Sequence, residues 1–552
     1  MSRRASPACR VLATAAALLT WGGAAGGLAG PTVVPLWPGP PPGAVRARGP
    51  EHPVEGRPRP FTQYTDIARP ELHVLAPPAG KGNGTAVLVC PGGAMQRLAW
   101  EHEGLEVAHW LNSLGCTAAL LKYRVPTTPL DAARDAQRAL SLVRERAESW
   151  GIDPAAVGVL GFSAGGEIAA WLQVHPQERL YPAGDAADRQ PVRPDFVALV
   201  YPGGLLAGRD GGLKEPLAGL VTAGLPPAFV VHAFDDASDN SLEWVRALKK
   251  AGVPAELHLY PTGGHGFGVR STGVAAGNWT RRFEEWLRLE GWLDPAAERR
   301  FARDWATAVA AGSTPPRLGE AVPGATLEAA YRVQQRGVRT RGASDRMAGF
   351  KATAVTAQAQ QNLGVPGPLV GVVWKSGQLA SAPSPVIDGA SARGLLLETE
   401  MGYVTSVDLS YEILTEAQAC GAVAAMMPVI ELPETRGAVP GTTTAADLVA
   451  GNIGSARFIV GPAGPVVETG PDAVEVEFLR DNVRLHMGRG SDVAGGQWGN
   501  LRQVLNEITR RGYTIPAGSL ILSGALGKIQ PGAPGKYVAH YGALGTITFE
   551  VR

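Results

Sequence analysis

Apolar runs of strand length alternate with helical segments through the first half of the chain. The strand-like runs are "TAVLVCPGG", "CTAALLKYRVP", "VGVLGFSAGG", "FVALVYPGG" and "PAFVVHAFDD". Between them, "EGLEVAHWLNSLG", "DAARDAQRALSLVRERAESWG" and "LEWVRALKKAG" have the spacing of amphipathic helices. Strands that alternate with helices predict an α/β domain, in which crossover helices cover a largely parallel sheet.

This alternation stops near residue 295, and a chain of 552 residues is too long for one ordinary core. "WLDPAAERRFARDW" begins a helical stretch, and from about Ala348 short strands and Gly turns dominate. We therefore expect a first domain over 30–295 and a second, β-rich mixed α+β domain over 296–552.

The N-terminus has the layout of a secretory signal peptide. A basic "MSRR" precedes the apolar "VLATAAALL" and the small-residue stretch "GGAAGGLAG". We expect a signal peptide over 1–29, cleaved after Ala25 or Ala29, and a periplasmic or secreted protein; an Ala-rich leader without a targeting role is the alternative. No later run is apolar for 18 residues, so no membrane span is expected.

The net charge and the cysteines of the chain bear on its possible partners and on disulfide or zinc sites. The net charge of +1 with 18% charged residues does not indicate a nucleic-acid partner. The four cysteines, Cys9, Cys90, Cys116 and Cys420, form neither a disulfide framework nor a zinc-ligand spacing.

A serine nucleophile is predicted in "GVLGFSAGGEIAAW". Ser163 lies between Gly161 and Gly165, directly after an apolar strand and before a helix. A nucleophile elbow needs this arrangement, because the tight turn leaves no room for side chains and presents the hydroxyl at the sheet edge. A Gly-rich turn that merely contains a serine is the alternative.

Two later strand ends supply the other members of a catalytic triad in the order Ser, Asp, His. "FVVHAFDDASDNS" places Asp236 after one strand, and "LHLYPTGGHGFG" places His265 after the next. His265 would take the proton from Ser163, and Asp236 would fix its tautomer. Asp235, and less so Asp239, remain alternatives for the acid.

An oxyanion hole needs two backbone donors. The amide of Ala164 is one candidate, and the loop "CPGGAM" offers the other within Gly92 to Ala94, with Gly92 and Gly93 as the leading candidates.

The motifs "VLVCPGGAM", "LLKYRVP", "GVLGFSAGGEIAA" and "GGHGFG" resemble those of α/β-hydrolase esterases of the acetyl xylan and feruloyl esterase type. The resemblance covers about Val34 to Asp294. It implies hydrolysis of a small-molecule carboxylic ester without a cofactor, on a plant-polysaccharide fragment among other possibilities. A peptidase is the alternative, because the same triad cleaves amides.

The second half carries carboxylates at strand ends. In "GLLLETEMGYV", Glu398 and Glu400 are two apart and therefore point to one face of a strand, and Glu431 follows another apolar run in "MMPVIELPETR". Three converging carboxylates suit a hard divalent cation such as Mg²⁺. For the pair alone, a solvated strand face is the alternative.

The segments "LEAAYRVQQ", "GFKATAVTAQAQ", "LETEMGYV" and "VIELPETR" resemble the 2-keto-4-pentenoate hydratases of the fumarylacetoacetate hydrolase superfamily, from about Glu298 to Arg552. The resemblance implies Mg²⁺ or Mn²⁺ held by the three glutamates and a 2-oxo acid bound to that metal. It also implies that Lys351 orients the substrate or transfers a proton, and that Asn452 and Ser455 bind substrate.

The leading interpretation is therefore a bifunctional exported enzyme, an esterase fused to a 2-oxo acid hydratase. An acidic segment usual in these hydratases is replaced by "LGVPGPLVG". A degenerate binding or oligomerisation domain is thus one alternative for the second half, and a decarboxylase or C–C hydrolase is another. A homo-oligomer is possible.

Overall fold

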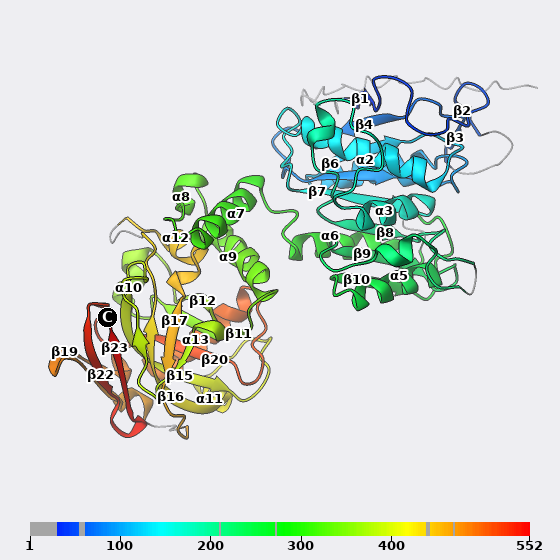
Figure 1. The fold of residues 1–552 in the computed structure, drawn as a ribbon. Coiled ribbons are helices and arrows are strands. Elements are labelled where there is room, and N and C mark those ends of the chain that lie inside the picture. The colour runs from blue at the N-terminus through cyan, green and yellow to red at the C-terminus, as the bar shows by residue number, and fades with distance from the viewer. Residues whose placement is uncertain (1–29, 55–60, 209–210, 271–272, 438–441, 467–469) are drawn as a thin grey trace, which may run out of the picture.

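The computed structural model describes residues 30–552 except 55–60, 209–210, 271–272, 438–441 and 467–469. The predicted signal peptide, 1–29, lies outside the described residues. Figure 1 shows two lobes that are consecutive in the chain, with the C-terminus at the far edge of the second lobe.

A single sheet organises the first lobe. Its order is β1 (Thr32–Pro35), β4 (Glu71–Leu75), β6 (Thr117–Lys122), β5 (Ala86–Cys90), β7 (Val157–Phe162), β8 (Val197–Val200), β9 (Ala228–Ala233) and β10 (Ala255–Tyr260). The ladders from β6 to β10 are parallel, whereas β1 and β4 pair antiparallel with their neighbours. A short ladder joins β2 (His52–Pro53) to β3 (Tyr64–Thr65).

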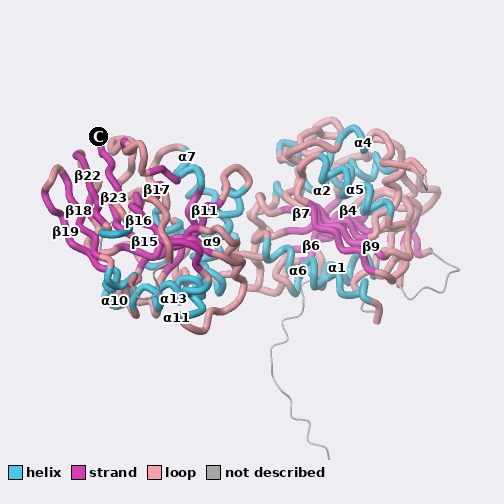
Figure 2. Tube along the Cα trace, turned by 90° about the horizontal axis from the view of Figure 1, so that it is seen from below, coloured by secondary structure: helices cyan, strands magenta, loops and turns pink. Residues whose placement is uncertain are grey.

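Helices cover both faces of this sheet. They are α1 (Glu106–Ser113), α2 (Pro129–Glu145), α3 (Ala164–Val174), α4 (Leu217–Leu220), α5 (Asp239–Lys250) and α6 (Trp279–Leu289). Figure 2 shows α2 and α5 on one side and α1 and α6 on the other. Because both faces are covered, β5, β7, β8 and β9 are buried along their whole length, which explains their continuous apolar sequences.

The second lobe contains two sheets. The larger has the order β12 (Leu369–Trp374), β11 (Met347–Thr353), β20 (Leu520–Ala525), β15 (Leu396–Thr405), β16 (Val423–Leu432), β17 (Arg457–Val460) and β13 (Gln378–Ala380), with β21 (Gln530–Pro531) beside β15. The smaller has the order β14 (Val386–Ile387), β23 (Thr546–Val551), β22 (Gly535–His540), β18 (Glu475–Arg480) and β19 (Val483–Arg489).

The helices of this lobe are α7 (Ala296–Ala310), α8 (Leu318–Ala321), α9 (Leu327–Gly342), α10 (Ala357–Leu363), α11 (Glu416–Gly421), α12 (Ala445–Ala450) and α13 (Gly496–Arg510). Helix α9 contacts α7 and α12, and α13 contacts β12 and β20. The predicted fold class is confirmed, since an α/β sheet with crossover helices precedes a β-rich mixed domain.

The two hydrophobic cores separate at the start of α7. The first core and its packed neighbours end at Leu293, and the second begins at Phe301. Between them, the guanidinium of Arg299 is buried and pairs with Asp153 of the first lobe at 3.3 Å, and Arg303 pairs with the same carboxylate at 3.2 Å. We keep the division at 295/296 as our proposal, with α7 anchored to both domains.

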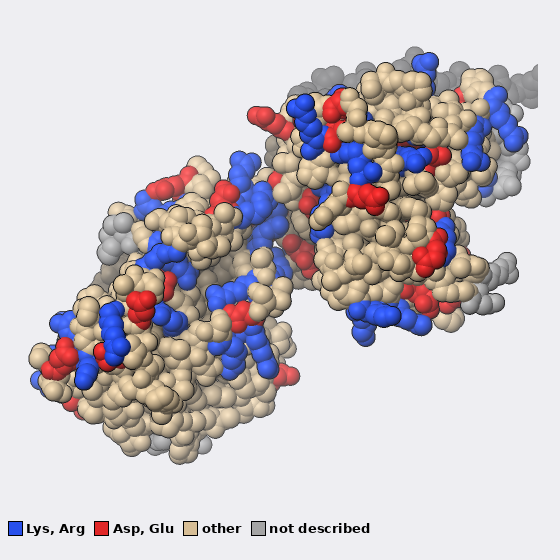
Figure 3. Space-filling model, in the orientation of Figure 1, with Lys and Arg blue, Asp and Glu red and all other residues tan. Residues whose placement is uncertain are grey.

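Basic side chains gather where the lobes meet, as Figure 3 shows. Arg336 donates to the carbonyl of Gly291 at 3.0 Å and lies over the ring of Trp292. Burial, together with the neighbouring cations of Arg299, Arg339 and Arg303, lowers the pKa of Arg336 to about 10. In the part of the chain that the structure describes, no helix has the length and apolar character needed to span a membrane.

Candidate active sites in the two domains

Ser163 occupies a strained turn between β7 and α3. Its φ of 53° and ψ of −116° lie outside the regions that side-chain-bearing residues favour. A Cβ on Gly161 would lie 2.0 Å from the carbonyl oxygen of Gly165, and one on Gly165 would lie 1.9 Å from that of Cys90. Only glycine therefore fits the two flanking positions, as the elbow pattern predicts.

The three residues of the predicted triad lie in hydrogen-bond contact. The Oγ of Ser163 is 2.8 Å from Nε2 of His265, and Nδ1 of His265 is 2.6 Å from Oδ2 of Asp236. The alternative acid, Asp235, instead accepts hydrogen bonds from the amides of Gly264 and Gly263. Asp235 thus shapes the histidine loop, and the geometry favours Asp236 as the acid.

The pKa shifts of His265 and Asp236 suit a role of His265 as general base. The hydrogen bond to Asp236 raises the pKa of His265, although burial acts in the opposite direction. Burial raises the pKa of Asp236, but the hydrogen bonds from His232 and His265 outweigh it and hold that pKa well below its usual range. Asp236 is therefore ionised at neutral pH.

His232 is a member of the site that the sequence analysis missed. It is buried in β9, with Nε2 3.0 Å from Oδ2 of Asp236 and Nδ1 2.8 Å from Oγ of Ser241. Its only sequence signal is a polar residue inside the apolar "AFVVHA" run, four positions before Asp236. The carboxylate of Asp236 is thus held from two sides.

The expected oxyanion hole needs one correction. The amide of Gly92 donates to Oε2 of Glu103 at 2.8 Å and so faces away from the nucleophile. Among the described residues, the amides of Gly93 and Ala164 have no hydrogen-bond acceptor. Gly93 has a φ of 135°, and a Cβ there would lie 1.9 Å from the carbonyl oxygen of Arg97. The amides of Gly93 and Ala164 therefore remain the candidates for the oxyanion hole.

The three glutamates of the second domain come together on the larger sheet. Glu398 on β15 is directly opposite Glu431 on β16, and Glu400 is two residues further along β15. All three are buried, and one oxygen of each lies within 4.8 Å of the others. The solvated strand face is thereby excluded for Glu398 and Glu400.

Several of these buried oxygens have no donor. The Oε1 of Glu400 and Oε2 of Glu431 lack a hydrogen-bond partner among the described residues, whereas Oε2 of Glu400 accepts from the amide of Gly524 at 2.8 Å. Burial and the charge of Glu431 raise the pKa of Glu398 to about 7 and that of Glu400 well above its usual value. Carboxylate oxygens that lack a hydrogen-bond partner are hard ligands of the kind that fit a bound Mg²⁺ or Mn²⁺ ion.

Lys351 on β11 lies at the same cluster. Its Nζ forms an ion pair with Glu431 and donates to the carbonyl of Ile453 at 3.0 Å. Burial by itself lowers the pKa of Lys351, but the carboxylates of Glu431, Glu398 and Glu400 outweigh it and raise that pKa. Lys351 is therefore a cation that partly compensates the three glutamates.

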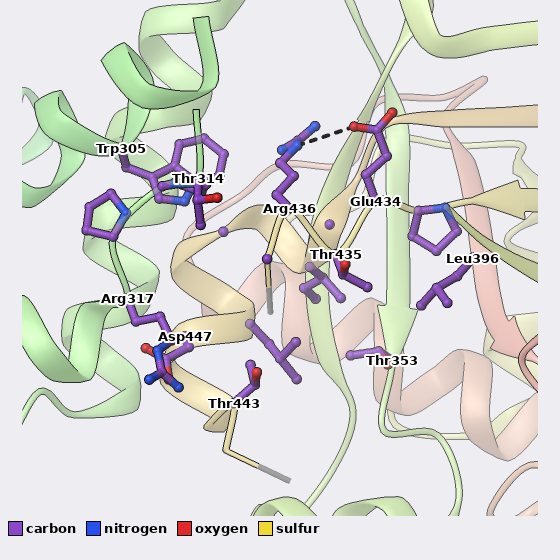
Figure 4. Close-up of a pocket in the computed structure, with 18 of the residues that line it drawn as sticks. Trp305, Thr314, Arg317, Thr353, Leu396, Glu434, Thr435, Arg436, Thr443 and Asp447 are labelled. Atoms are coloured by element: carbon purple, nitrogen blue, oxygen red, sulfur yellow. Dashed lines mark ion pairs between the residues drawn. The ribbon is translucent and has the colours of Figure 1, made fainter. Parts of the chain in front are cut away.

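A cavity of about 460 Å³ opens onto this cluster, with Lys351 and Glu398 in its lining. Figure 4 shows Arg436 directed toward Glu434, from which it lies 3.7 Å, with Arg317 and Trp305 on the other side of the cavity. These lining residues were not predicted. The two arginines suit an anionic substrate.

Asn452 and Ser455 do not line this cavity. Both polar atoms of the Asn452 side chain bind the backbone of Val372. Oδ1 accepts from the Val372 N–H and Nδ2 donates to the Val372 carbonyl, both at 2.8 Å. Ser455 holds Arg436 through its backbone carbonyl at 3.3 Å. The substrate-binding expectation is corrected, because both residues line a neighbouring cavity between α7 and α9 and act as supports.

Comparisons with known proteins agree with this two-part structure. A model of the alpha/beta hydrolase fold matches residues 92–212. The acetylxylan esterase of Xylanibacter ruminicola is 29% identical over 241 residues, which cover 38% of this chain and 45% of the relative. The chain thus spans less than half the length of that relative.

The second half matches other proteins. The 2-keto-4-pentenoate hydratase of Paraburkholderia phymatum is 30% identical over 234 residues, which cover 42% of this chain and 88% of the relative. The 4-oxalocrotonate decarboxylase from Pseudomonas putida G7, solved with magnesium and adipate, is 22% identical with a TM-score of 0.44 and covers 46% of this chain and 97% of that chain.

These findings describe a chain of two parts: a domain of the α/β-hydrolase fold that is similar to an esterase, fused to a hydratase-like domain of the fumarylacetoacetate hydrolase superfamily. Its C-terminal half belongs to the family of the 2-keto-4-pentenoate hydratases.

Proposed function

We propose that the first domain is a serine carboxylic-ester hydrolase. The observation that carries the proposal is the continuous contact from Ser163 through His265 to Asp236. His265 takes the hydroxyl proton as Oγ of Ser163 attacks the ester carbonyl, and it then gives that proton to the leaving alcohol. The amides of Gly93 and Ala164 stabilise the oxyanion. Water, deprotonated by His265, releases the acid from Ser163.

An acetyl or feruloyl ester on a plant-polysaccharide fragment is the proposed substrate class. The similarity to an acetylxylan esterase supports this class. An aryl acetate assay tests the proposal, with an amide of the same acyl group as the peptidase control. Ester turnover that disappears in Ser163→Ala is the expected result, and turnover of the amide alone contradicts it.

We propose that the second domain acts on a 2-oxo acid with Mg²⁺ or Mn²⁺ held by Glu398, Glu400 and Glu431. The unpartnered oxygens of Glu400 and Glu431 carry this proposal. Such an ion, when bound, supplies Lewis-acid stabilisation of negative charge beside the keto group. Lys351 lines the same cavity and orients the substrate or holds a proton at Nζ. Arg436 and Arg317, which also line the cavity, attract the carboxylate of the 2-oxo acid.

Hydration of a 2-keto-4-pentenoate-type substrate is the leading reaction. Decarboxylation or C–C cleavage is the second candidate, favoured by the absence of acidic residues in "LGVPGPLVG". Incubating the full chain with 2-keto-4-pentenoate and 4-oxalocrotonate, with Mg²⁺ or with chelator, separates hydration from decarboxylation by product mass. Metal-dependent binding without turnover of either acid would instead identify a degenerate binding domain.

A further inference from the structure

A buried carboxylate lies directly behind the esterase site. Glu103 belongs to a π-helical turn, η1 (Glu101–Leu105), which precedes α1, and it is 3% exposed. Single π-helical turns occur frequently at functional sites. In the part of the chain that the structure describes, no Lys or Arg forms an ion pair with Glu103. The buried carboxylate must therefore be satisfied by hydrogen-bond donors.

The donors come from two different loops of the catalytic site. The amide of Gly92 donates to Oε2 at 2.8 Å, and the hydroxyl of Tyr201 donates to Oε1 at 2.9 Å. Nε2 of His102 lies 3.4 Å from the same Oε1. One carboxylate thus joins the loop after β5, which carries the oxyanion donor Gly93, to the end of β8.

Tyr201 extends the connection to the histidine loop. Its fully buried hydroxyl accepts from the amide of Gly268 at 3.0 Å, three residues after His265. The ring centroids of Tyr201 and His265 are 5.0 Å apart, and the ring of Phe267 packs on Tyr201 at 4.4 Å. The backbone of Tyr201 has a φ of 38°, a conformation that needs tertiary support.

The carboxylate also packs close to the nucleophile. A Cβ on Gly92 would lie 2.7 Å from Oε2 of Glu103 and 2.7 Å from Cβ of Ser163. The side chains of Glu103 and Ser163 therefore both pack against the place that a side chain at position 92 would occupy, and only glycine fits there. Glu103 fixes the amide of Gly92, and the carbonyl of Gly92 accepts from the amide of Ala99 at 2.9 Å. Together these hydrogen bonds orient the peptide between Gly92 and Gly93, which presents the amide of Gly93.

We propose that Glu103 is a positioning residue for ester hydrolysis, which holds the oxyanion loop through Gly92 and the histidine loop through Tyr201 and Gly268. This inference rests on the proposed serine-hydrolase function. Glu103 does not touch the reacting atoms, so its loss affects how well the oxyanion donor and the base are placed.

The test is Glu103→Gln in the full chain, because glutamine has the same size but offers one acceptor oxygen to two donors. Glu106→Gln is the matched control, since Glu106 is in the adjoining turn and pairs with Arg270 instead. We expect kcat on an aryl ester to fall about 10- to 100-fold with KM changed less than about twofold, because oxyanion contacts act in the transition state. The control should keep the wild-type rate.

A pH profile separates positioning from a purely structural role. The charged or polar groups that contact His265 or act on its pKa are Asp236, Ser163, Tyr201 and Glu103. Asp235 accepts from the amide of Gly264, the residue before His265. Because the negative charge of Glu103 helps to raise the pKa of His265, the acid limb of kcat/KM should move to lower pH in Glu103→Gln. A fold defect alone would lower the amplitude of the profile without this shift.

Labelling of Ser163 by a fluorophosphonate gives a readout that needs no ester substrate. Slower labelling that still reaches the wild-type extent supports the proposal. A labelling rate equal to that of Glu106→Gln overturns the proposal. So does a lower activity that is explained entirely by a smaller fraction of protein that can be labelled. If Glu103→Gln does not fold, Tyr201→Phe removes the hydroxyl that joins Glu103 to the amide of Gly268 and leaves the hydrogen bond between Glu103 and Gly92 in place. This variant should still slow labelling, and an unchanged rate there overturns the inference.

The same experiment distinguishes the two proposals. If wild type is labelled at Ser163 but hydrolyses no ester, the substrate class fails while the labelling rates still decide the role of Glu103. If Ser163→Ala is labelled as fast as wild type, the proposed nucleophile and this inference fail together.

Discussion

Glu398 and Glu431 face each other directly across the β15–β16 ladder, and both side chains are buried. Like charges opposite one another in a ladder are destabilising, and burial increases that cost. Lys351 supplies one positive charge for the three glutamates of the cluster. A divalent cation would supply the rest, which makes metal removal the most direct test of this domain.

We predict that Mg²⁺ or Mn²⁺ stabilises the second domain and leaves the first unchanged. At a concentration about a hundredfold above Kd, binding to the native state adds about 2.7 kcal/mol to the free energy of unfolding. Calorimetry of the full chain, first with chelator and then with each metal, should show a shift of one transition only.

Two variants sharpen that measurement. Glu400→Gln keeps the size of the side chain and should abolish the metal-dependent shift without unfolding the domain. Glu412→Gln, at an exposed position of the same domain, should keep the shift. Equal shifts in both variants would remove Glu400 from the proposed ligands.

We predict that Asp236→Asn and Asp235→Asn differ sharply in esterase activity. Asparagine at 236 still contacts His265 but does not stabilise its cation, so kcat should fall about 10³-fold or more. Asparagine at 235 keeps one acceptor for the amides of Gly263 and Gly264 and should cost about tenfold or less. The reverse order of losses would make Asp235 the acid.

How much of this site was visible in the sequence depends on how local its geometry is. The Gly–Ser–Gly turn after an apolar strand is set by steric contacts within a few residues, so the elbow and the α/β fold followed from the pattern. The order of the strand ends then predicted that His265 lies next to Asp236. By contrast, no residue next to Glu103 in the sequence indicates that its carboxylate accepts a hydrogen bond from the amide of Gly92.

The remaining differences are also long-range. His232 occurs within an apolar strand and looks like a core residue, although it supports Asp236. Asn452 was expected to bind substrate, but its side-chain amide hydrogen-bonds the backbone of β12, about 80 positions away in the chain. Such pairings depend on which strands become neighbours, which periodicity alone does not specify.

We predict that esterase activity falls on acidification through a pKa above about 6.5, the ordinary value for histidine. His265 must be neutral to accept a proton, and its hydrogen bond to Asp236 raises its pKa. The same shift contributes stability that is fully present below the unfolded pKa and is lost as pH rises through the folded pKa. A pH profile of kcat/KM checks this, and an acid limb below the ordinary value would contradict it.

We propose that the chain is exported and cleaved before residue 31, on the strength of its basic start, apolar run and small residues. N-terminal sequencing of protein from a Gram-negative expression host should find a start within 26–30. An intact Met1 or Ser2 in a cytoplasmic fraction would show that the Ala-rich leader has no targeting role there.

We predict that the donor at position 232, and not the imidazole ring as such, supports the triad acid. The ionised carboxylate of Asp236 can only accept, so Nε2 of His232 donates to its Oδ2, while Nδ1 contacts the hydroxyl of Ser241. The amide nitrogen of glutamine reaches about as far as Nε2 of histidine, whereas that of asparagine reaches only as far as Nδ1.

His232→Gln should therefore keep kcat within about threefold of wild type, because Asp236 retains its second donor. His232→Asn leaves a partly desolvated carboxylate with one donor fewer, a loss of about 1–3 kcal/mol. We expect kcat to fall about tenfold in that variant, with a lower melting temperature of the first domain. Steady-state kinetics and melts of the two variants decide this. Equal activities would mean that His265 alone suffices to hold Asp236 in place.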